Sequence, residues 1–477
     1  MKPFNSLRAV QHAMALDGLT CTALVSHYLQ NIEANQHLNA FLEVYEQDAL
    51  AAAQVVDQKI ANGTAGRLAG MVLGIKDVLC YQDHGLQLSS KILDGFKSQF
   101  TATAVQRLLD EDAIIIGRQN CDEFAMGSSC ENSAFGPVHN GLDPQRVPGG
   151  SSGGSAVAVQ TDMCLASLGT DTGGSVRQPA SFCGIVGLKP TYSRISRYGL
   201  AAYASSFDVI GPLARSVDDC ALLLELMAGH DDYDSTVSTK PVPAYTEALT
   251  TYGKKARIAY INETLTSPGL NQQVKARTLE AIDFLKQQGH EVTGVDFPLT
   301  DYVLPTYYIL TTAEASSNLS RYDGVKYGYR SENSVNMEAM YKKSRSEGFG
   351  LEVQRRILLG TFVLSASYYD AYYTKAQKVR RLIRDKTHEL LQQYDFIVMP
   401  TTPTPAFNIG ACADNPLEMY IADLLTVQAS IAGVPCISIP NGTDNESGMP
   451  VGLQIMANDF KEADLLAFAK YIADNYR

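Results

Sequence analysis

Two glycine- and serine-rich turns, joined by a short apolar segment, constrain the fold of this 477-residue chain more than any other feature. The first turn reads Gly-Gly-Ser-Ser-Gly-Gly-Ser at residues 149–155, and the second reads Gly-Thr-Asp-Thr-Gly-Gly-Ser at residues 169–175. The segment between them, residues 156–168, is too apolar to be a linker. Glycine accepts positive φ and lets backbone amides approach a ligand closely. We therefore expect the two turns to pack together in one site.

The second turn has the composition of a loop that binds an oxyanion. The backbone N–H groups of Thr172, Gly173, Gly174 and Ser175 can be aimed at one oxygen, and a serine at the end of the turn can attack the carbon that carries this oxygen. A phosphate-binding loop is an alternative, but the turns match neither G-x-x-x-x-G-K-[ST] nor G-x-G-x-x-G. Taken alone, the glycines leave a catalytic turn and a purely structural turn open.

The wider pattern resembles the amidase signature family. The second turn continues as Val-Arg-Gln-Pro-Ala at residues 176–180, and Gly-Ile-Lys-Asp at residues 74–77 is similar to the lysine motif of that family. The resemblance implies Ser175 as nucleophile, Ser151 as a bridging serine preceded by a cis peptide bond, and Lys76 as base. It also implies the amidase signature fold, an α/β fold with a mixed central β-sheet covered by helices on both faces.

The chemistry of such a triad sets conditions that the residues around Lys76 satisfy. A serine hydroxyl is a weak nucleophile until a base takes its proton, and a lysine amine is a base only when burial lowers its pKa. The apolar run at residues 71–75 predicts a buried strand that ends at Lys76. The Ser151 hydroxyl can both donate and accept, and can relay a proton. A Ser-His-acid triad is the alternative, with His139 as the candidate among 8 histidines.

Strand and helix patterns alternate along most of the chain, which predicts a mostly parallel or mixed sheet with helices on both faces. Helices are predicted at residues 49–60, 104–112, from residue 155 onward, and at 272–288. Strands are predicted at residues 71–75, 113–117, 164–168, 255–261, 290–295, 395–399 and 451–455. We expect a single domain, because no repeat or clear linker interrupts this alternation.

Three regions of that domain differ in pattern. We expect a helical N-terminal region at about residues 1–65, with Thr20 or Thr22 as a cap, and a core with the signature motifs at about 66–220. A helical, tyrosine-rich insertion is predicted at about residues 302–395. Tyrosines at helical spacing usually belong to a core or an interface, and a few of these tyrosines are candidates for lining a substrate pocket.

Composition excludes several classes of function. The formal net charge is −12, from 39 basic and 51 acidic residues, which disfavours a broad nucleic-acid-binding surface. The 9 cysteines include no C-x-x-C pair, so we expect reduced, mostly buried thiols and no metal site. The N-terminus lacks the pattern of a signal peptide, and no apolar run reaches about 18 residues. We therefore expect a cytoplasmic protein without membrane contact.

Within the family, the chain resembles most closely the members that release ammonia from glutamine. Residues 120–129, 307–328 and 355–362 carry this part of the resemblance. The planar fork of an arginine suits a carboxylate. The resemblance implies that Arg356 binds the α-carboxylate of glutamine and that Asp423 binds its ammonium group.

The same resemblance implies further residues in the glutamine pocket. Tyr307 or Tyr308 is expected to line it, together with Gly127 and Ser128. Cys121 and Cys130 depart from the common family pattern, but neither position belongs to the implied triad.

The resemblance also implies partners. A B subunit would use ATP and magnesium to amidate misacylated Glu-tRNA(Gln), Asp-tRNA(Asn) or both, and would make most of the tRNA contacts. A small C subunit would complete a heterotrimer, and this chain itself would need no cofactor. Two alternatives remain at this point: a stand-alone amidase that acts on other amides, and a scaffold subunit without activity.

Overall fold

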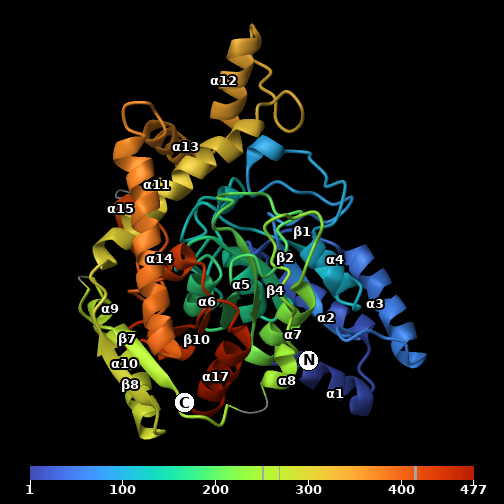
Figure 1. Ribbon diagram of the computed structural model, residues 1–477. Helices are drawn as coiled ribbons and strands as arrows, with labels where there is room; N and C mark the ends of the chain where they lie inside the picture. Colours follow the sequence, from blue (N-terminus) through green and yellow to red (C-terminus); the bar gives the residue numbers. More distant parts are fainter. Residues whose placement is uncertain (250–251, 268, 413–415, 477) are drawn as a thin grey trace.

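The computed structural model describes residues 1–249, 252–267, 269–412 and 416–476 (Figure 1). Within these residues, eleven strands form one sheet in the order β1-β3-β2-β4-β6-β5-β10-β11-β9-β7-β8. The strands are β1 (Phe41–Val44), β2 (Val72–Lys76), β3 (Ile114–Gln119), β4 (Ala166–Asp171), β5 (Val186–Lys189), β6 (Val209–Ala214), β7 (Arg257–Ile261), β8 (Glu291–Val295), β9 (Phe396–Pro400), β10 (Cys436–Thr443) and β11 (Pro450–Met456).

The sheet is mixed, and its parallel part places the carboxyl ends of β2 and β4 side by side. β2 runs parallel to both β3 and β4, with Leu73 opposite Ala166 and Ile75 opposite Leu168. β4 is antiparallel to β6. Because the carboxyl ends of parallel neighbours lie at the same edge of a sheet, Lys76 at the end of β2 lies beside the last residues of β4.

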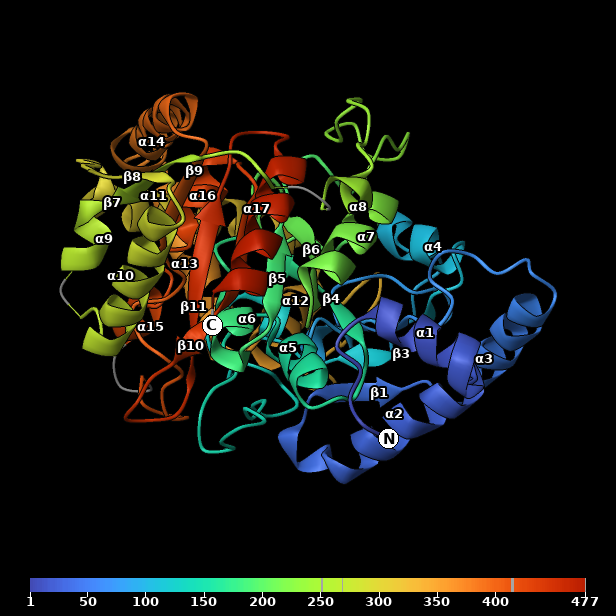
Figure 2. The same cartoon turned by 90° about the horizontal axis from the view of Figure 1, so that it is seen from below.

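Helices cover both faces of the sheet, as their contacts show. α5 (Gly153–Gln160) contacts β2, β4 and β6, whereas α6 (Arg177–Cys183) contacts β5, β10 and β11, and these two helices pack together. α7 (Val217–Met227) contacts β5 and β6, α17 (Glu462–Asn475) contacts β10 and β11, and these two helices contact each other (Figure 2). The mixed α/β sandwich expected from the sequence is confirmed.

The N-terminal region is helical, with one exception. It contains α1 (Leu7–Asp17), α2 (Cys21–Ala34) and α3 (Glu46–Ala61). The Thr20 hydroxyl accepts the N–H of Ala23 and caps α2, as expected. The prediction of a helical region missed β1, which pairs with the edge of β3. This strand is too short to show an alternating pattern in the sequence.

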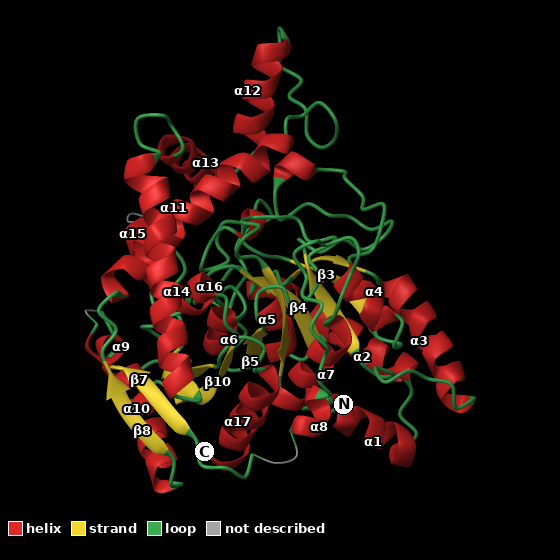
Figure 3. Cartoon of the chain, viewed as in Figure 1, coloured by secondary structure: helices red, strands yellow, loops and turns green. Residues whose placement is uncertain are grey.

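The tyrosine-rich region is helical, as predicted, and it extends away from the sheet (Figure 3). It comprises α11 (Thr300–Asn318), α12 (Met337–Gly348), α13 (Leu351–Val363) and α14 (Lys375–Gln393). α11 packs against both α13 and α14, and α14 also contacts α16 (Val427–Ala432). Figure 1 shows α12 projecting from this end of the molecule.

The remaining elements connect these layers. They are α4 (Thr103–Leu109), α8 (Tyr245–Ala248), α9 (Asn262–Thr266), α10 (Gln272–Gln287) and α15 (Pro416–Ile421), the 3₁₀ turns Gln36–Leu38, Lys91–Leu93, Glu123–Ala125 and Leu319–Arg321, and a π-helical turn, Asp370–Thr374. None of the helices in the described ranges has the length and hydropathy needed to span a membrane. Eight of the cysteines are buried and form no disulfide.

Every predicted strand overlaps a strand of the sheet, but four strands were not predicted. Besides β1, these are β5, β6 and β10. β5 and β6 contain glycine, β6 and β10 contain proline, and both residue types weaken the sequence pattern of a strand. These strands form because their neighbours in the sheet supply the pairing that their own residues favour only weakly.

Candidate active site

Lys76 lies at the end of β2, where its amine is fully buried. Its Nζ lies 2.6 Å from Ser151 Oγ, 2.9 Å from Ser152 Oγ and 3.0 Å from Thr170 Oγ1. The two serines belong to the turn that precedes α5, and Thr170 belongs to the parallel neighbour β4. Burial is the main cause that lowers the pKa of the Lys76 amine below its ordinary value. The structure therefore brings together the lysine and the bridging serine predicted from the sequence.

The turn that carries Ser151 is held by Asp122. The Gly150–Ser151 peptide bond is cis, as expected. The N–H of Asp122 donates to the Ser151 carbonyl at 3.1 Å. Its carboxylate accepts the N–H groups of Cys130 at 2.9 Å and Asn132 at 3.1 Å. Burial raises the pKa of the Asp122 carboxyl to about 6. Sequence reasoning missed this residue, because a lone aspartate in a loop carries no signal of such contacts.

A buried ion pair holds the second turn, which carries Ser175. The Asp171 carboxylate accepts the Nε–H of Arg177 at 3.0 Å and an Nη2–H at 2.9 Å, and neither side chain is exposed. Burial alone would raise the pKa of Asp171, but the Arg177 charge and its hydrogen bonds hold this pKa below its ordinary value. Removing one partner of such a pair typically costs about 3–5 kcal/mol. The pair therefore fixes the position of the turn above it.

The backbone N–H groups of this turn differ in whether they already have an acceptor in the protein. The Gly174 N–H donates to Asp171 Oδ1 at 2.8 Å. The N–H groups of Thr172, Gly173 and Ser175 have no acceptor within the described part of the chain. The prediction that all four groups can bind an oxyanion therefore needs correction at Gly174, because the carboxylate below the turn already occupies its N–H.

Gly173 and Gly174 of this turn are required by close approaches from other elements. Gly174 has φ +134°, and a Cβ there would lie 2.3 Å from Thr426 Oγ1. A Cβ on Gly173 would lie 2.4 Å from the hydroxyl oxygen of Tyr307, which extends from α11. The Thr426 hydroxyl also donates to the Gly173 carbonyl. The Ser175 hydroxyl, by contrast, forms no hydrogen bond among the described residues, and 8% of this residue is exposed.

Arg356, on α13, is buried in a cage of aromatic and acidic side chains. Its Nε–H donates to Glu352 Oε1 at 2.8 Å, and an Nη1–H donates to the Tyr203 hydroxyl at 2.9 Å. Its guanidinium carbon lies 5.4 Å from the ring centre of Tyr308 and 5.6 Å from that of Tyr420. Within the described residues, Nη2 makes no hydrogen bond, so one edge of the guanidinium is available to a ligand. Sequence reasoning missed Glu352 and Tyr203.

Asp423 forms one cluster with two other predicted pocket residues. Its Oδ1 accepts the Ser128 hydroxyl at 2.7 Å, and its Oδ2 accepts the Tyr308 hydroxyl at 2.7 Å. Burial raises the pKa of the Asp423 carboxyl to about 6, and the positive charge of Arg356 opposes part of this rise. The candidate anion and cation for an amino acid are therefore neighbours, although they lie far apart in the sequence.

A cavity of about 230 Å³ reaches Arg356, whereas Asp423, Ser128 and Tyr308 are not among its lining residues. Gly127, Glu352, Arg356 and Tyr420 are among the residues that line it. A Cβ on Gly127 would lie 2.3 Å from the Asp122 carboxyl carbon, so a side chain at this position would displace the aspartate that holds the Ser151 turn. The cavity thus connects the arginine cage to the loop beside the two turns.

His139 does not take part in this arrangement. Its ring Nδ1 donates to the Pro144 carbonyl at 2.6 Å within its own loop. In the ranges that the structure describes, no histidine forms a hydrogen bond with Ser151 or Ser175. The geometry therefore favours Lys76 over His139 as the base.

Thr172 contacts a second buried acid that the sequence did not indicate. Its hydroxyl donates to Asp208 Oδ1 at 2.8 Å. The other oxygen of Asp208 accepts the N–H groups of Tyr203 at 2.9 Å and Ala204 at 3.0 Å. Burial raises the pKa of this carboxyl to about 7. Asp208 therefore links the serine turn to the segment that carries one wall of the arginine cage.

Across the described residues, no group of three or more histidine, cysteine or acidic side chains is arranged to hold a metal ion.

Comparison with known proteins agrees with this geometry. Residues 23–466 match the family model described as Amidase. A relative from Chlorobium luteolum, named as the A subunit of glutamyl-tRNA(Gln) amidotransferase, is 51% identical over 470 residues, which cover 98% of this chain and 97% of the relative. A relative of the same name from Chlorobaculum tepidum is 50% identical over 470 residues, with 98% of each chain covered.

A solved structure leads to the same family. The crystal structure of the A subunit of glutamyl-tRNA(Gln) amidotransferase from Thermotoga maritima superposes with a TM-score of 0.77 at 37% identity, covering 96% of this chain and 94% of that one. Both the resemblance of the two turns and the extent of these matches therefore lead to one conclusion. The chain belongs to the Amidase family, and it is an enzyme that acts on C–N bonds.

Proposed function

We propose that the chain is the glutamine-hydrolysing component of a glutamyl-tRNA(Gln) amidotransferase, and that Lys76, Ser151 and Ser175 form its catalytic triad. The observation that carries this proposal is the buried Lys76 amine, which lies 2.6 Å from Ser151 Oγ at the edge where the Ser175 turn begins. The names of the relatives, at about half identity over nearly the whole chain, support the choice of substrate and complex.

The three contacts of Lys76 match the hydrogen-bonding groups of a neutral amine. A neutral amine has two N–H donors and one lone pair. The two N–H groups are suited to Ser152 Oγ and Thr170 Oγ1, and the lone pair to the Ser151 hydroxyl. Burial favours this neutral form. Lys76 then takes the proton of Ser175 through Ser151 as the Ser175 oxygen attacks the side-chain amide of glutamine.

The oxyanion formed by this attack is stabilised by the unoccupied N–H groups of Thr172, Gly173 and Ser175. The proton held at Lys76 returns through Ser151 to the leaving nitrogen, and ammonia departs. Water then hydrolyses the acyl-enzyme and releases glutamate. The Asp171–Arg177 pair acts by holding the turn in place, since it takes the Gly174 N–H and leaves the other three available.

Glutamine is recognised by the charges at its amino acid end. The free edge of Arg356 binds the α-carboxylate, and Asp423 binds the ammonium group. Tyr308 and Ser128 orient Asp423 through their hydrogen bonds. Tyr307 covers the turn at Gly173 and closes the site toward α11.

The ammonia is used by partners. In this proposal a B subunit uses ATP and magnesium to activate misacylated Glu-tRNA(Gln), or Asp-tRNA(Asn), and makes most of the tRNA contacts, and a C subunit completes the heterotrimer in the cytoplasm. This chain itself then requires no cofactor. The names of the relatives support a multi-subunit amidotransferase.

Ammonia release from glutamine, measured beside a panel of simple amides, tests the proposal. The chain is assayed with its native partners, and Ser175→Ala serves as the blank. We expect release that depends on glutamine and rises when ATP and misacylated tRNA are added. Release only from other amides would assign the chain to the stand-alone amidases, and no release from any amide would leave a scaffold role.

A further inference from the structure

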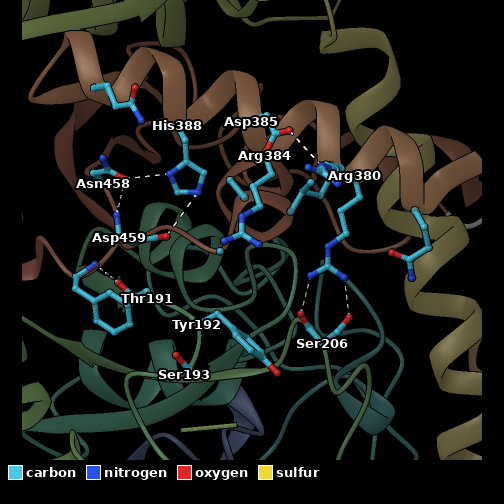
Figure 4. A pocket seen from close by; sticks show the side chains of 17 residues that line it. Thr191, Tyr192, Ser193, Ser206, Arg380, Arg384, Asp385, His388, Asn458 and Asp459 are labelled. Atoms are coloured by element: carbon cyan, nitrogen blue, oxygen red, sulfur yellow. Dashed lines mark hydrogen bonds and ion pairs between the residues drawn. The ribbon is translucent and has the colours of Figure 1, made fainter. Parts of the chain in front are cut away.

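A second cavity, of about 950 Å³, lies apart from the candidate active site. α14 forms one wall, and residues 191–193, 431–433 and 458–460 form much of the remainder (Figure 4). None of the residues proposed above for catalysis or glutamine binding lines it. Small-molecule sites in proteins commonly have volumes of roughly 300–1,000 Å³, so the cavity is large enough for a ligand of nucleotide size.

Two arginines and a histidine on one face of α14 point into this cavity. Arg380, Arg384 and His388 follow each other at intervals of four residues and therefore share a face of the helix. Like charges at this spacing destabilise an isolated helix. Burial lowers the pKa of Arg380, and the neighbouring charge of Arg384 adds to this effect. In a chain with a net charge of −12, this cluster is a local feature and not a property of the whole surface.

The two carboxylates at the cavity lie beside side chains other than Arg380 and Arg384. Asp385 lies 3.5 Å from Arg381, which is 84% exposed at the rim. Asp459 Oδ2 lies 3.6 Å from the Nε2 of His388. In the described chain, neither acid forms an ion pair with Arg380 or Arg384.

The two inward arginines have no carboxylate partner in the described chain. Arg380 donates only to the hydroxyl and carbonyl oxygens of Ser206, each at 2.9 Å. Glu314 lies behind Ser206 and accepts its N–H, and it is the acid that most favours the charged form of Arg380. Arg384 is exposed and forms no hydrogen bond or ion pair with any described residue, and Figure 4 shows it extending from α14 into the cavity.

The shape and charge of the site indicate the class of ligand. A guanidinium binds phosphate through two parallel hydrogen bonds, and the hydroxyl-bearing residues Thr191 and Ser193 lie on the opposite wall. Asp385 and Asp459 at the margin would repel a long polyanion such as RNA. A compact anion satisfies the two arginines without passing these carboxylates.

We propose that this cavity is a second ligand site of the protein, and that it binds a small molecule through a phosphate or pyrophosphate group held by Arg384 and Arg380. The site is separate from the glutamine pocket, in which Arg356 is the cation. It therefore does not depend on the assignment of glutamine as substrate.

Isothermal titration of the full chain with inorganic pyrophosphate tests the proposal. We expect saturable binding at one site, weakened about tenfold or more in Arg384→Gln and in Arg380→Gln, since a charge-assisted hydrogen bond is typically worth about 1.5–3 kcal/mol. Lys378→Gln is the matched control, because it removes the same charge from an exposed position of α14 outside the cavity lining. Circular dichroism of each variant verifies that α14 remains folded.

Two further arms separate this site from its alternatives. Saturating glutamine and the Arg356→Ala variant should leave pyrophosphate binding unchanged, and loss of binding in either case would place the anion in the glutamine pocket. The proposal is overturned if pyrophosphate does not bind at millimolar concentration, or if Arg384→Gln behaves like Lys378→Gln. Tighter, Arg384-dependent binding of an RNA oligonucleotide or an acidic peptide would also overturn it.

Discussion

The signature core and the tyrosine-rich helices hold their candidate residues in different ways. In the core, at about residues 66–220, Lys76 and Ser151 are fully buried. Lys76 ends β2, and Ser151 lies beside it in the turn that precedes α5. Their positions follow from the strand register of β2 and from the turn held by Asp122. In the helical region, at about residues 302–395, Arg356 is placed by Glu352 on its own helix and by tyrosines from three distant segments, Tyr203, Tyr308 and Tyr420.

The difference suggests a division of roles within the site. A parallel sheet edge fixes backbone groups with little freedom, which suits chemistry that needs oriented donors. A cage built from helix side chains suits recognition, because each side chain contributes one contact to the substrate. We therefore expect changes in the core to lower kcat and changes in the helical region to raise KM for glutamine.

The largest effect is expected for Lys76→Ala. Without the amine, Ser175 loses the group that takes its proton, and removal of a member of a catalytic triad commonly costs at least about 10³-fold in kcat. Single-turnover measurement of ammonia release from glutamine checks this, with thermal unfolding as the test of folding. Activity of Lys76→Ala within tenfold of the parent enzyme would exclude the amine as base.

Arg356→Ala tests the other half of the comparison. Loss of a charged hydrogen-bond partner of the α-carboxylate should raise KM for glutamine by about 10- to 100-fold and change kcat much less. Arg355→Ala is the comparison, because Arg355 lines the same cavity and also pairs with Glu352 but is 38% exposed. An equal loss in both variants would show that pairing with Glu352, and not substrate binding, accounts for the effect.

The pH dependence of KM sharpens the assignment of Asp423. The carboxylate binds an ammonium group only when it is charged, and burial raises its pKa to about 6. As pH falls below this value, the charged fraction falls about tenfold per unit, so KM should be about tenfold higher at pH 5 than at pH 8. Steady-state kinetics across this range measure the change, and Asp423→Asn should give a high KM that no longer varies with pH. A KM that rises with pH instead would contradict the role.

The smallest effect is expected for Tyr308→Phe. This change removes the hydroxyl that donates to Asp423 at 2.7 Å, leaves the ring beside Arg356, and should raise KM only about three- to tenfold. Tyr372→Phe is the comparison, because Tyr372 belongs to the same tyrosine-rich region but is 40% exposed. We expect Tyr372→Phe to leave KM unchanged. Steady-state kinetics of the two variants show whether the rise in KM requires loss of the Tyr308 hydroxyl or follows from loss of any tyrosine hydroxyl in this region.

Much of the fold and part of the site could be predicted from the sequence. The strand ending at Lys76 and the turns around Ser151 and Ser175 have local patterns, because apolar runs and glycine-rich turns are properties of adjacent residues. The strands β5 and β6 could not be predicted in this way, since their glycine and proline residues weaken the pattern and the neighbouring strands stabilise them instead.

The sequence by itself determined the residue types at the two turns, the lysine at the end of a buried strand, and the family to which these motifs belong. Only the tertiary structure decided how the donors are used. Asp171 takes the Gly174 N–H, Glu352 and Tyr203 engage Arg356, and Arg384 is left with no partner in the described chain. The physical reason is that a hydrogen bond depends on which groups meet in space and compete for one donor, and the folded chain settles this both for near neighbours such as Asp171 and for distant residues such as Tyr203.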